Sequence, residues 1–338
     1  MDSDGRARSA LADSWRGAGP NHRIIIDTDP GQDDAIAILA ALASPEIEVL
    51  GICTVAGNVP LPLTTCNALK ICELAGRTDV PVHAGAAAPL RRPLVTAEDV
   101  HGDTGLNGPD LPAPRMEAGS QHAVDFIVET LRREPAGTVT LCALGPMTNI
   151  ASAFARAPDV VARVARIVAM GGGRSEGGNI TPVAEFNVYA DPHAARAVLG
   201  AGVPIVLHPL DVTHRAVTSD DRIAAFRALG TRAGTAVAEM LAFAQAFDME
   251  RYGAAGGPLH DPNVIAFLVR PEIYRGRLVN VEVETESELT MGQTVVDWWG
   301  ATDRPRNVHY ITEVDDTALF ALLVERIGRL RETSAKGS

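Results

Sequence analysis

The stretch "IIIDTDPGQDDA", residues 24–35, decides the fold, because three consecutive isoleucines lead directly into a dense cluster of carboxylates. A continuous apolar run of this kind is typical of a strand that is buried on both faces of a parallel sheet. Pro30 and Gly31 then favour a sharp turn, which folds the second acidic pair back toward the first. Four carboxylates are therefore expected at the end of a buried strand: Asp27, Asp29, Asp33 and Asp34.

The rest of the chain alternates between short β-branched runs and Ala/Leu-rich stretches with helical spacing. Strands are expected at 23–28, 47–55, 80–84, 138–143, 165–170 and 204–209, and helices at 33–43, 62–76, 121–133, 147–157 and 191–201. Mostly helical sequence continues to about residue 270, and strand-like segments near 278–284, 293–298 and 307–313 precede a helix at 316–331. This alternation predicts an α/β fold with an open, mostly parallel central sheet flanked by helices.

The domain organisation is expected to be simple, since no low-complexity linker and no internal repeat interrupts the chain. We expect a flexible N-terminal extension at 1–22, one domain with helical insertions at 23–332, and a flexible tail at 333–338. The first 22 residues carry early acidic residues and lack the apolar core of a secretory signal. No apolar run approaches the 18 residues of a membrane span, so a cytoplasmic protein without a membrane partner is expected.

The charge and the cysteines narrow the classes of partner. The formal net charge is −12, and only two of the 30 basic residues are lysines, so no basic stripe is available to bind nucleic acid. The cysteines lie in apolar surroundings without a C-x-x-C pair, which predicts reduced core residues: Cys53, Cys66, Cys72 and Cys142.

The acidic cluster has a structural and a chemical interpretation. Asp33 or Asp34 can cap the helix that is expected near Ala35, but this leaves Asp27 and Asp29 unexplained. A set of oxygen ligands suits Ca²⁺ or Mg²⁺ better than zinc. An EF-hand is excluded, because its loop needs glycine at the sixth position and glutamate at the twelfth. Counted from Asp27, those positions hold glutamine and isoleucine.

Two further functions remain open at this point. The "DTD" stretch also fits a phosphohydrolase of the haloacid dehalogenase type. Such enzymes usually bind the phosphoryl group with a downstream lysine, and both lysines here are poorly placed for this, since Lys70 is expected inside a helix and Lys336 in the tail. A calcium-dependent protein that binds nucleosides or sugars without hydrolysing them is the alternative from another class.

The full string "DTDPGQDDAIAI" resembles the signature of the inosine-uridine-preferring nucleoside hydrolases. The resemblance runs from about residue 23 to 330 and includes six further motifs in the family's order. They are "TVAGN" (54–58), "HGDTG" (101–105), "LGPMTNIA" (144–151), "MGGG" (170–173), "GNITPVAEFNVYADPHAA" (178–195) and "GGPLHDP" (256–262). A series of motifs in this order is far more specific than the acidic motif alone.

The resemblance implies calcium-dependent hydrolysis of the N-glycosidic bond of ribonucleosides, which gives ribose and free base. It implies that the calcium ligands are Asp29, Asp34, Asp261 and the backbone carbonyl of Leu144. It also implies that Asp29 takes a proton from a metal-bound water as this attacks C1′ of the ribose. Asp27 is then expected to orient the acidic loop without binding the metal itself.

The remaining site residues also follow from the resemblance. Those expected to hold the sugar and substrate are Asp33, Asn58, His101, Met170, Asn179, Glu185 and Asn187. Taken singly, Asn58 and Asn179 can also be turn residues, and Glu185 with Asn187 can be one face of a strand. His260 is the candidate acid that protonates the leaving base. The stretch "YGAAGGPLHDP" looks closer to the pyrimidine-preferring branch, and family members are commonly homodimers or homotetramers.

Overall fold

Strand β1 lies in the middle of the sheet, and its isoleucines point alternately to the two faces. The computed structural model describes residues 21–252 and 256–330. In it Ile24 and Ile26 pack into one hydrophobic cluster, with the helices of one face, whereas Ile25 packs into the cluster on the other face. This alternation follows from the two-residue period of a strand. Burial on both sides therefore explains why the run is continuously apolar.

The sheet has nine strands in the order β3-β2-β1-β4-β5-β6-β9-β7-β8. The strands from β3 to β9 in this order pair in parallel, and β7 pairs antiparallel with both β9 and β8. The bounds are β1 His22–Thr28, β2 Ile47–Thr54, β3 Val82–Ala84, β4 Val139–Ala143, β5 Val164–Met170, β6 Ile205–His208, β7 Tyr274–Val283, β8 Thr294–Asp297 and β9 Val308–Val314. The predicted α/β fold with an open, mostly parallel sheet is confirmed.

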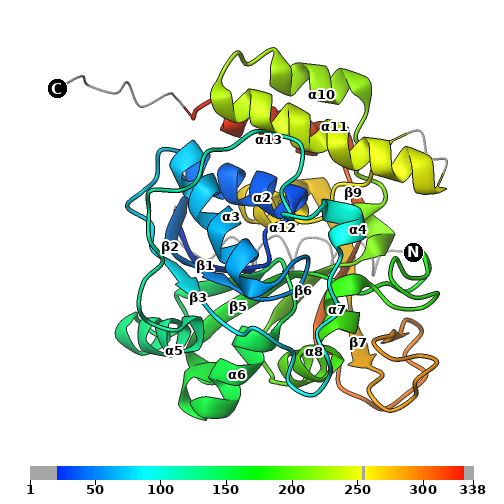
Figure 1. The fold of residues 1–338 in the computed structure, drawn as a ribbon. Helices are drawn as coiled ribbons and strands as arrows, with labels where there is room; N and C mark the ends of the chain where they lie inside the picture. Colours follow the sequence, from blue (N-terminus) through cyan, green and yellow to red (C-terminus); the bar gives the residue numbers. More distant parts are fainter. Residues whose placement is uncertain (1–20, 253–255, 331–338) are drawn as a thin grey trace.

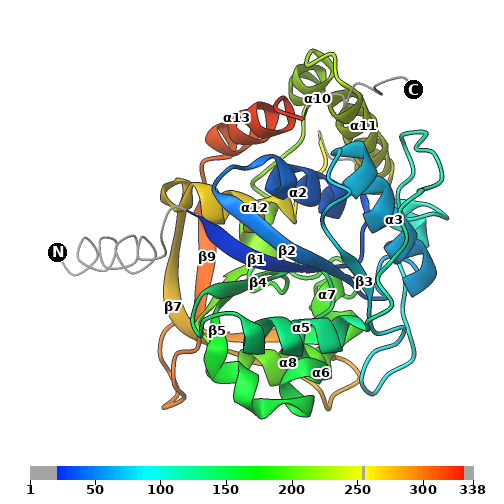
Figure 2. The ribbon, with the colours of Figure 1, turned by 90° about the vertical axis from the view of Figure 1, so that its left-hand side faces the viewer.

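Helices cover both faces of the sheet (Figures 1 and 2). One face carries α2 Gln32–Ala43, α3 Leu61–Leu74, α12 Pro262–Val269 and α13 Asp316–Ile327, and beyond them lie α10 Asp220–Arg227 and α11 Arg232–Tyr252. The other face carries α5 Ala123–Arg133, α6 Thr148–Arg156 and α8 Pro192–Leu199. Short helices join these layers: α4 Glu98–His101, α7 Phe186–Ala190 and α9 Leu210–Thr213. No helix within the described residues is long and apolar enough to cross a membrane.

The predicted strands and main helices are present in the structure, with ends that differ by a few residues. Residues 186–190 form α7, whereas the alternative interpretation placed Glu185 and Asn187 on a strand. The final helix ends at Ile327 rather than near 331. Most of the predicted N-terminal extension and the whole predicted tail lie outside the described residues. Three cysteines are buried and Cys66 is half-buried, and all four are free, as expected.

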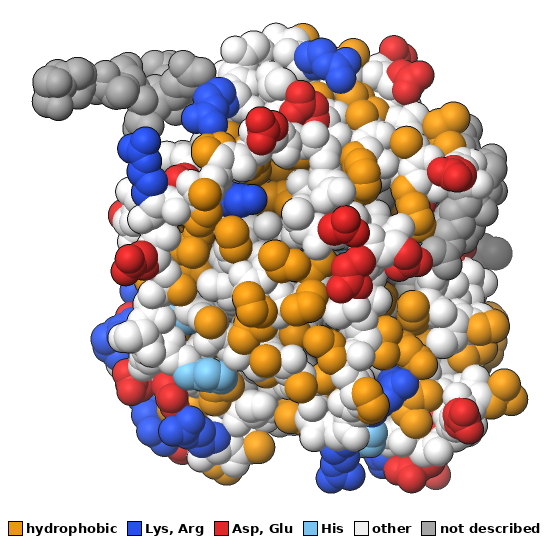
Figure 3. Space-filling model, in the orientation of Figure 1, with side chains coloured by type: hydrophobic (Ala, Val, Ile, Leu, Met, Phe, Trp, Pro, Cys, Tyr) orange, Lys and Arg blue, Asp and Glu red, His pale blue; other side chains and the backbone are white. Residues whose placement is uncertain are grey.

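The surface charge is unevenly distributed. On the face shown in Figure 3, acidic side chains gather near the middle, in the region that α4 occupies in Figure 1. Hydrophobic side chains surround this acidic region over much of the same face.

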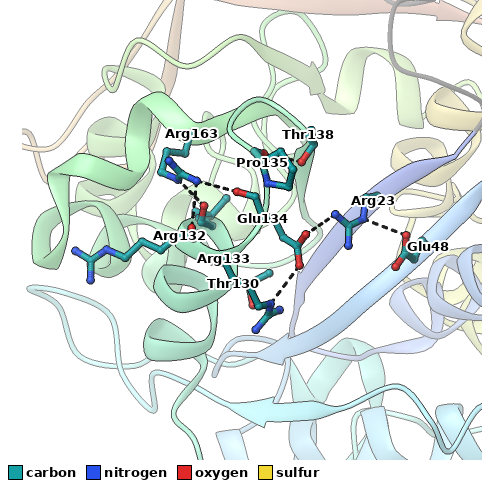
Figure 4. Close-up of polar contacts among 10 residues, drawn as sticks. Arg23, Glu48, Thr130, Arg132, Arg133, Glu134, Pro135, Thr138 and Arg163 are labelled. Atoms are coloured by element: carbon teal, nitrogen blue, oxygen red, sulfur yellow. Dashed lines mark hydrogen bonds and ion pairs between the residues drawn. The ribbon is translucent and has the colours of Figure 1, made fainter.

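Arginines stabilise the opposite end of the sheet, where β1 begins (Figure 4). Arg23 forms ion pairs with Glu48 of β2 and with Glu134 at the end of α5. Arg163 donates to the carbonyl oxygens of Leu131 at 2.6 Å and Glu134 at 2.8 Å. Cations at a helix C-terminus satisfy its free carbonyl groups and complement the helix dipole. These contacts tie α5 to the strands and leave the carboxyl ends of the strands to the site.

Candidate active site

The site lies at the carboxyl ends of β1, β2 and β4. The chain leaves β1 toward β2 on one side and later returns to β4 on the other, so the strand order reverses beside β1. In open parallel sheets such a switch point opens a crevice in which ligands bind. The loops after these strands carry the acidic cluster, Asn58 and Leu144, which brings three of the predicted motifs together.

Asp29 is buried directly behind the floor of this crevice. Its Oδ2 accepts a hydrogen bond of 2.7 Å from the backbone N–H of Asn58. Its Oδ1 has no hydrogen-bond partner among the described residues. Gly57 and Gly145 lie against the two oxygens, and a Cβ atom at either position would come within 2.0 or 2.2 Å of them. The two glycines therefore leave the space that the carboxylate occupies.

Asp34 and Asp261 form the floor together with Asp33. Oxygens of these three carboxylates all lie within 4.8 Å of one another. Asp34 belongs to the first turn of α2 and accepts hydrogen bonds from the Thr28 hydroxyl, from the Gly31 N–H at 3.0 Å and from the Asn58 amide at 3.2 Å. The cap interpretation is thus correct for one carboxylate, since Asp34 receives the N–H of the residue that precedes the helix.

Burial raises the pKa of Asp34 and raises the pKa of Asp261 and Asp29 well above the usual range. Negative charges on neighbouring carboxylates raise all three further. Ionising such a group costs free energy unless a cation relieves the repulsion. The donor set consists of oxygen atoms, and Asp29 adds a buried oxygen without a partner. The residues therefore fit a hard divalent cation.

The predicted ligand set and the geometric trio overlap without being identical. Asp34 and Asp261 belong to both. Asp33, which was expected to hold the sugar, belongs to the trio. The expected ligand Asp29 is outside the trio, and its carboxylate accepts the backbone N–H of Asn58. Asp27 lies further back, where its Oδ1 accepts a hydrogen bond of 2.7 Å from Asn149. Burial raises the pKa of Asp27 to about 7.

On the other side of the floor, α7 presents Glu185 and Asn187. Glu185 caps this helix, because its carboxylate accepts the N–H groups of Asn187 at 2.8 Å and Val188 at 3.1 Å, and it also accepts that of Gly172 at 2.9 Å. Burial raises the pKa of Glu185 to about 7. The strand-face alternative is wrong here, because a buried carboxylate that satisfies free N–H groups favours a helix start.

Asn187, Asn179 and Met170 complete this side. The Asn187 amide donates to the Leu144 carbonyl at 2.6 Å and to the Met170 sulfur at 3.5 Å. The Asn179 side chain accepts a hydrogen bond of 2.8 Å from the N–H of Phe186. Asn179 therefore fixes the loop before α7, which agrees with the turn interpretation, and it also lines the cavity.

Two of the predicted site residues, His101 and His260, are histidines that line the cavity. The Nδ1 atom of His260 is 2.8 Å from the Thr213 hydroxyl. Burial, and next the positive charges that His214 and His101 can carry, lower the pKa of His260 to about 3. The ring is therefore a neutral imidazole near pH 7. His101, at the end of α4, lies 2.6 Å from the Gln32 side-chain oxygen through its Nδ1 atom.

The floor and the walls enclose a cavity of about 640 Å³. This volume lies in the range of small-molecule sites. Apart from Asp29, every predicted site residue lines it: Asp33, Asp34, Asn58, His101, Leu144, Met170, Asn179, Glu185, Asn187, His260 and Asp261. The structure thus brings together residues that are more than 200 positions apart in the sequence.

Other lining residues were not predicted. They include Gln245 and Asp248 on α11, and His214, which lies 3.3 Å from Glu176. The sequence carried a weak signal for the first pair, because positions three apart on a helix share a face. It gave no sign of which face of α11 points to the cavity. That depends on how α11 packs against α2 and α10.

A parallel sheet with an acidic cluster at its switch point and a cavity above it is typical of α/β enzymes, and the cluster is a candidate site for a cation. The sequence profile described as "Inosine-uridine preferring nucleoside hydrolase" matches residues 24–321. The chain belongs to this family, and it is a nucleoside hydrolase. This finding removes the haloacid dehalogenase alternative and the alternative of a protein that only binds nucleosides.

Similar proteins cover almost the whole domain. The chain is 56% identical over 308 residues to the uncharacterized protein C1683.06c of Schizosaccharomyces pombe, which is 91% of this chain and 99% of that protein. It is 46% identical over 305 residues to the pyrimidine-specific ribonucleoside hydrolase RihA of Salmonella gallinarum, which is 90% of this chain and 97% of that protein.

Solved structures with the same fold include a purine-preferring enzyme, unlike the relative from Salmonella gallinarum. A plant nucleoside hydrolase shares 32% identity with a TM-score of 0.84, and the match covers 91% of this chain and 99% of that one. A purine-preferring ribonucleoside hydrolase from Gardnerella vaginalis shares 31% identity with a TM-score of 0.85, over 91% and 98% of the two chains. The fold alone therefore leaves the preferred base open.

Proposed function

We propose that this nucleoside hydrolase depends on calcium and prefers pyrimidine nucleosides, uridine and cytidine. The observation that carries the calcium requirement is the trio of Asp33, Asp34 and Asp261, whose carboxylates meet at the cavity floor beside the unpartnered Oδ1 of Asp29. The pyrimidine preference rests on the 46% identity to a relative named pyrimidine-specific. We further propose a homodimer or homotetramer in the cytoplasm, as the family resemblance suggests.

Asp29 is the proposed general base. Its Oδ2 is held by the Asn58 N–H, so Oδ1 is the oxygen that takes the proton of the attacking water. When bound, calcium would supply positive charge that keeps the carboxylates ionised and lowers the pKa of water, with Asp29, Asp34, Asp261 and the Leu144 carbonyl as ligands. Direct attack of water on C1′ predicts inversion at the anomeric carbon.

The sugar is proposed to lie between the floor and α7. Carboxylates and amides hold hydroxyl groups by directional hydrogen bonds. Those we assign to this role are Asp33, Asn58, Asn179, Glu185 and Asn187, with Met170 in apolar contact. The amide of Asn187 already donates to the Leu144 carbonyl, so it links the sugar contacts to a proposed metal ligand. A ribose held there places its C1′ atom beneath His101 and His260.

His260 is proposed to assist departure of the base. We assign the Thr213 hydroxyl, 2.8 Å from Nδ1, as the donor of this hydrogen bond, which leaves the proton of the neutral imidazole on Nε2. That N–H can donate to the base as the C1′–N bond breaks. His101 is assigned a supporting contact to the substrate, because its Nδ1 atom is already engaged by Gln32.

The test is a release assay across uridine, cytidine, inosine and adenosine, with free base and reducing sugar measured separately. We expect release from the two pyrimidine nucleosides to be faster. Asp29→Asn keeps the shape of the side chain but removes the base. It should lower turnover by at least ~10²-fold, the lower range for a lost acid–base group. Asp303→Asn is the matched control, since Asp303 is exposed.

The outcomes separate the parts of the proposal. Release that is faster from both purine nucleosides would reverse the base preference and leave the chemistry intact. Near-normal turnover of Asp29→Asn with metal bound would assign the base to another residue.

A further inference from the structure

One wall of the cavity is formed by α11, and it carries two polar side chains that the sugar and metal sites leave unused. Leu241, Gln245 and Asp248 follow one another at helical spacing and all line the cavity. Gln245 is almost fully buried, at 8% exposed. After burial, the negative charge of Asp33 at the floor also raises the pKa of Asp248. The wall and the floor therefore face the same space.

The Asp248 carboxylate packs directly against the backbone of Gly257. A Cβ atom at Gly257 would lie 2.4 Å from Asp248 Oδ2 and 3.5 Å from the Gln245 Cα atom. Gly257 itself lines the cavity, and its N-terminal neighbour Gly256 does so too. The missing side chain at Gly257 therefore leaves the space that the Asp248 carboxylate occupies at the cavity wall.

Both side chains offer acceptors rather than donors to that space. The Gln245 amide nitrogen donates to Asp220 Oδ1 at 3.1 Å, which leaves the amide oxygen for another partner. Asp248 makes no hydrogen bond or ion pair with the described residues. Burial raises its pKa to about 6, so the carboxylate is mostly ionised above pH 7 and acts only as an acceptor.

We propose that Asp248 and Gln245 form an acceptor pair that binds the exocyclic amino group of the base and so selects cytidine over uridine. This inference rests on the proposed nucleoside hydrolysis, because the ribose must first occupy the acidic floor. An amino group presents two N–H donors, which match the two acceptors. The O4 carbonyl of uracil would instead face both acceptors and lose its hydrogen bond with water.

The discrimination is expected to be substantial. A site built to bind an N–H group rejects an analogue without it, because its own buried polar groups are then left unpaired. A hydrogen bond to a charged group corresponds to roughly tenfold to a hundredfold in kcat/KM. We therefore expect the wild-type enzyme to favour cytidine over uridine by about tenfold or more.

The experiment compares kcat/KM for cytidine, uridine and N4,N4-dimethylcytidine at pH 7.5. Asp248→Asn keeps the size of the side chain but turns one acceptor into an amide that can donate to O4. The cytidine-to-uridine ratio should fall by at least about tenfold in this variant. The wild-type enzyme should hydrolyse dimethylcytidine as poorly as uridine, because it has no N–H on N4.

Glu239→Gln is the matched control, because it removes the same charge from an exposed position of α11. Its cytidine-to-uridine ratio should equal that of the wild type. An unchanged ratio in Asp248→Asn, or rapid hydrolysis of dimethylcytidine by the wild type, would overturn the inference. Failure of the proposed function is distinguishable, since the wild type would then release nothing even from nitrophenyl riboside, which needs no recognition of a base.

Discussion

Adding one methyl group beside Asp29 tests whether this buried carboxylate is the centre of the site. In Gly145→Ala, the new Cβ atom would lie 2.2 Å from Asp29 Oδ1. This is about 1.2 Å short of the ordinary contact distance of 3.4 Å. Gly145 has no positive φ angle that would strain alanine, so the effect should come from the contact itself.

Something must move to relieve this contact, and each possible movement harms the proposed chemistry. If the carboxylate turns away, the oxygen without a partner leaves its position. If the backbone at Gly145 moves instead, it displaces the carbonyl of the neighbouring residue, Leu144. The backbone N–H of Leu144 donates to the Asp27 carbonyl at 2.8 Å. A misplacement of about 1 Å can cost roughly 10²-fold in rate. We expect kcat/KM for uridine or cytidine to fall by at least that factor.

The assay measures kcat/KM and calcium affinity, the latter by titration calorimetry, with a thermal melt to verify folding. Overpacking of this kind costs about 1–3 kcal/mol, so the variant should still fold. Gly200→Ala is the control, because Gly200 has helical φ and ψ angles and its nearest atom to a new Cβ lies at 3.2 Å. A Gly145→Ala enzyme with near-normal turnover and calcium affinity would refute the reasoning.

Three other predictions concern the metal, the leaving group and pH. Exhaustive chelation should abolish turnover, and calcium should restore it better than magnesium; full activity without metal would exclude the requirement. His260→Ala should slow uridine hydrolysis by ~10²-fold or more but affect nitrophenyl riboside much less. Equal losses on both substrates with calcium still bound would make His260 a structural residue. In the metal-free protein, the raised pKa values of the buried carboxylates, about 7 for Asp27 and Glu185, mean that the folded state binds more protons than the unfolded state. Its melting temperature should therefore fall as pH rises from about 4 to 7, and added calcium should restore more stability at pH 8 than at pH 5. A melting temperature that rises over this range would show that these groups ionise freely.

The central sheet was predictable because its signal is local. Residues 24–26 are apolar without interruption, and burial on both faces of the sheet allows no other composition. The β-branched runs at 139–143 and 164–170 follow the same rule. Since parallel strands end at one edge, the loops after them had to meet, and this placed the acidic cluster near Leu144. The motif resemblance then supplied Asp261, which lies over 200 residues away.

The features of the site that could not be predicted from the sequence depend on tertiary contacts. Glu185 caps a five-residue helix and also accepts the N–H of Gly172 from the loop after β5, and no periodicity signals so short a helix. The orientation of α11 is set by packing, so the exposure of Gln245 and Asp248 to the cavity was not visible in the chain. The sequence also did not show that Asp33 lies within 4.8 Å of Asp34 and Asp261, because this proximity depends on how the start of α2 packs against the segment before α12.

The acidic floor links stability to function. Burying several carboxylates without a cation is unfavourable, which shows in the raised pKa values of Asp29, Asp34 and Asp261. The hydrogen bonds from Asn58, Thr28 and Gly31 hold two of these side chains in place before any ligand arrives. A cation that binds such a prearranged set needs little reorganisation, and ionised carboxylates then bind it most strongly. Burial of these carboxylates therefore connects the cost of ionising them with the binding of a cation that would offset this cost.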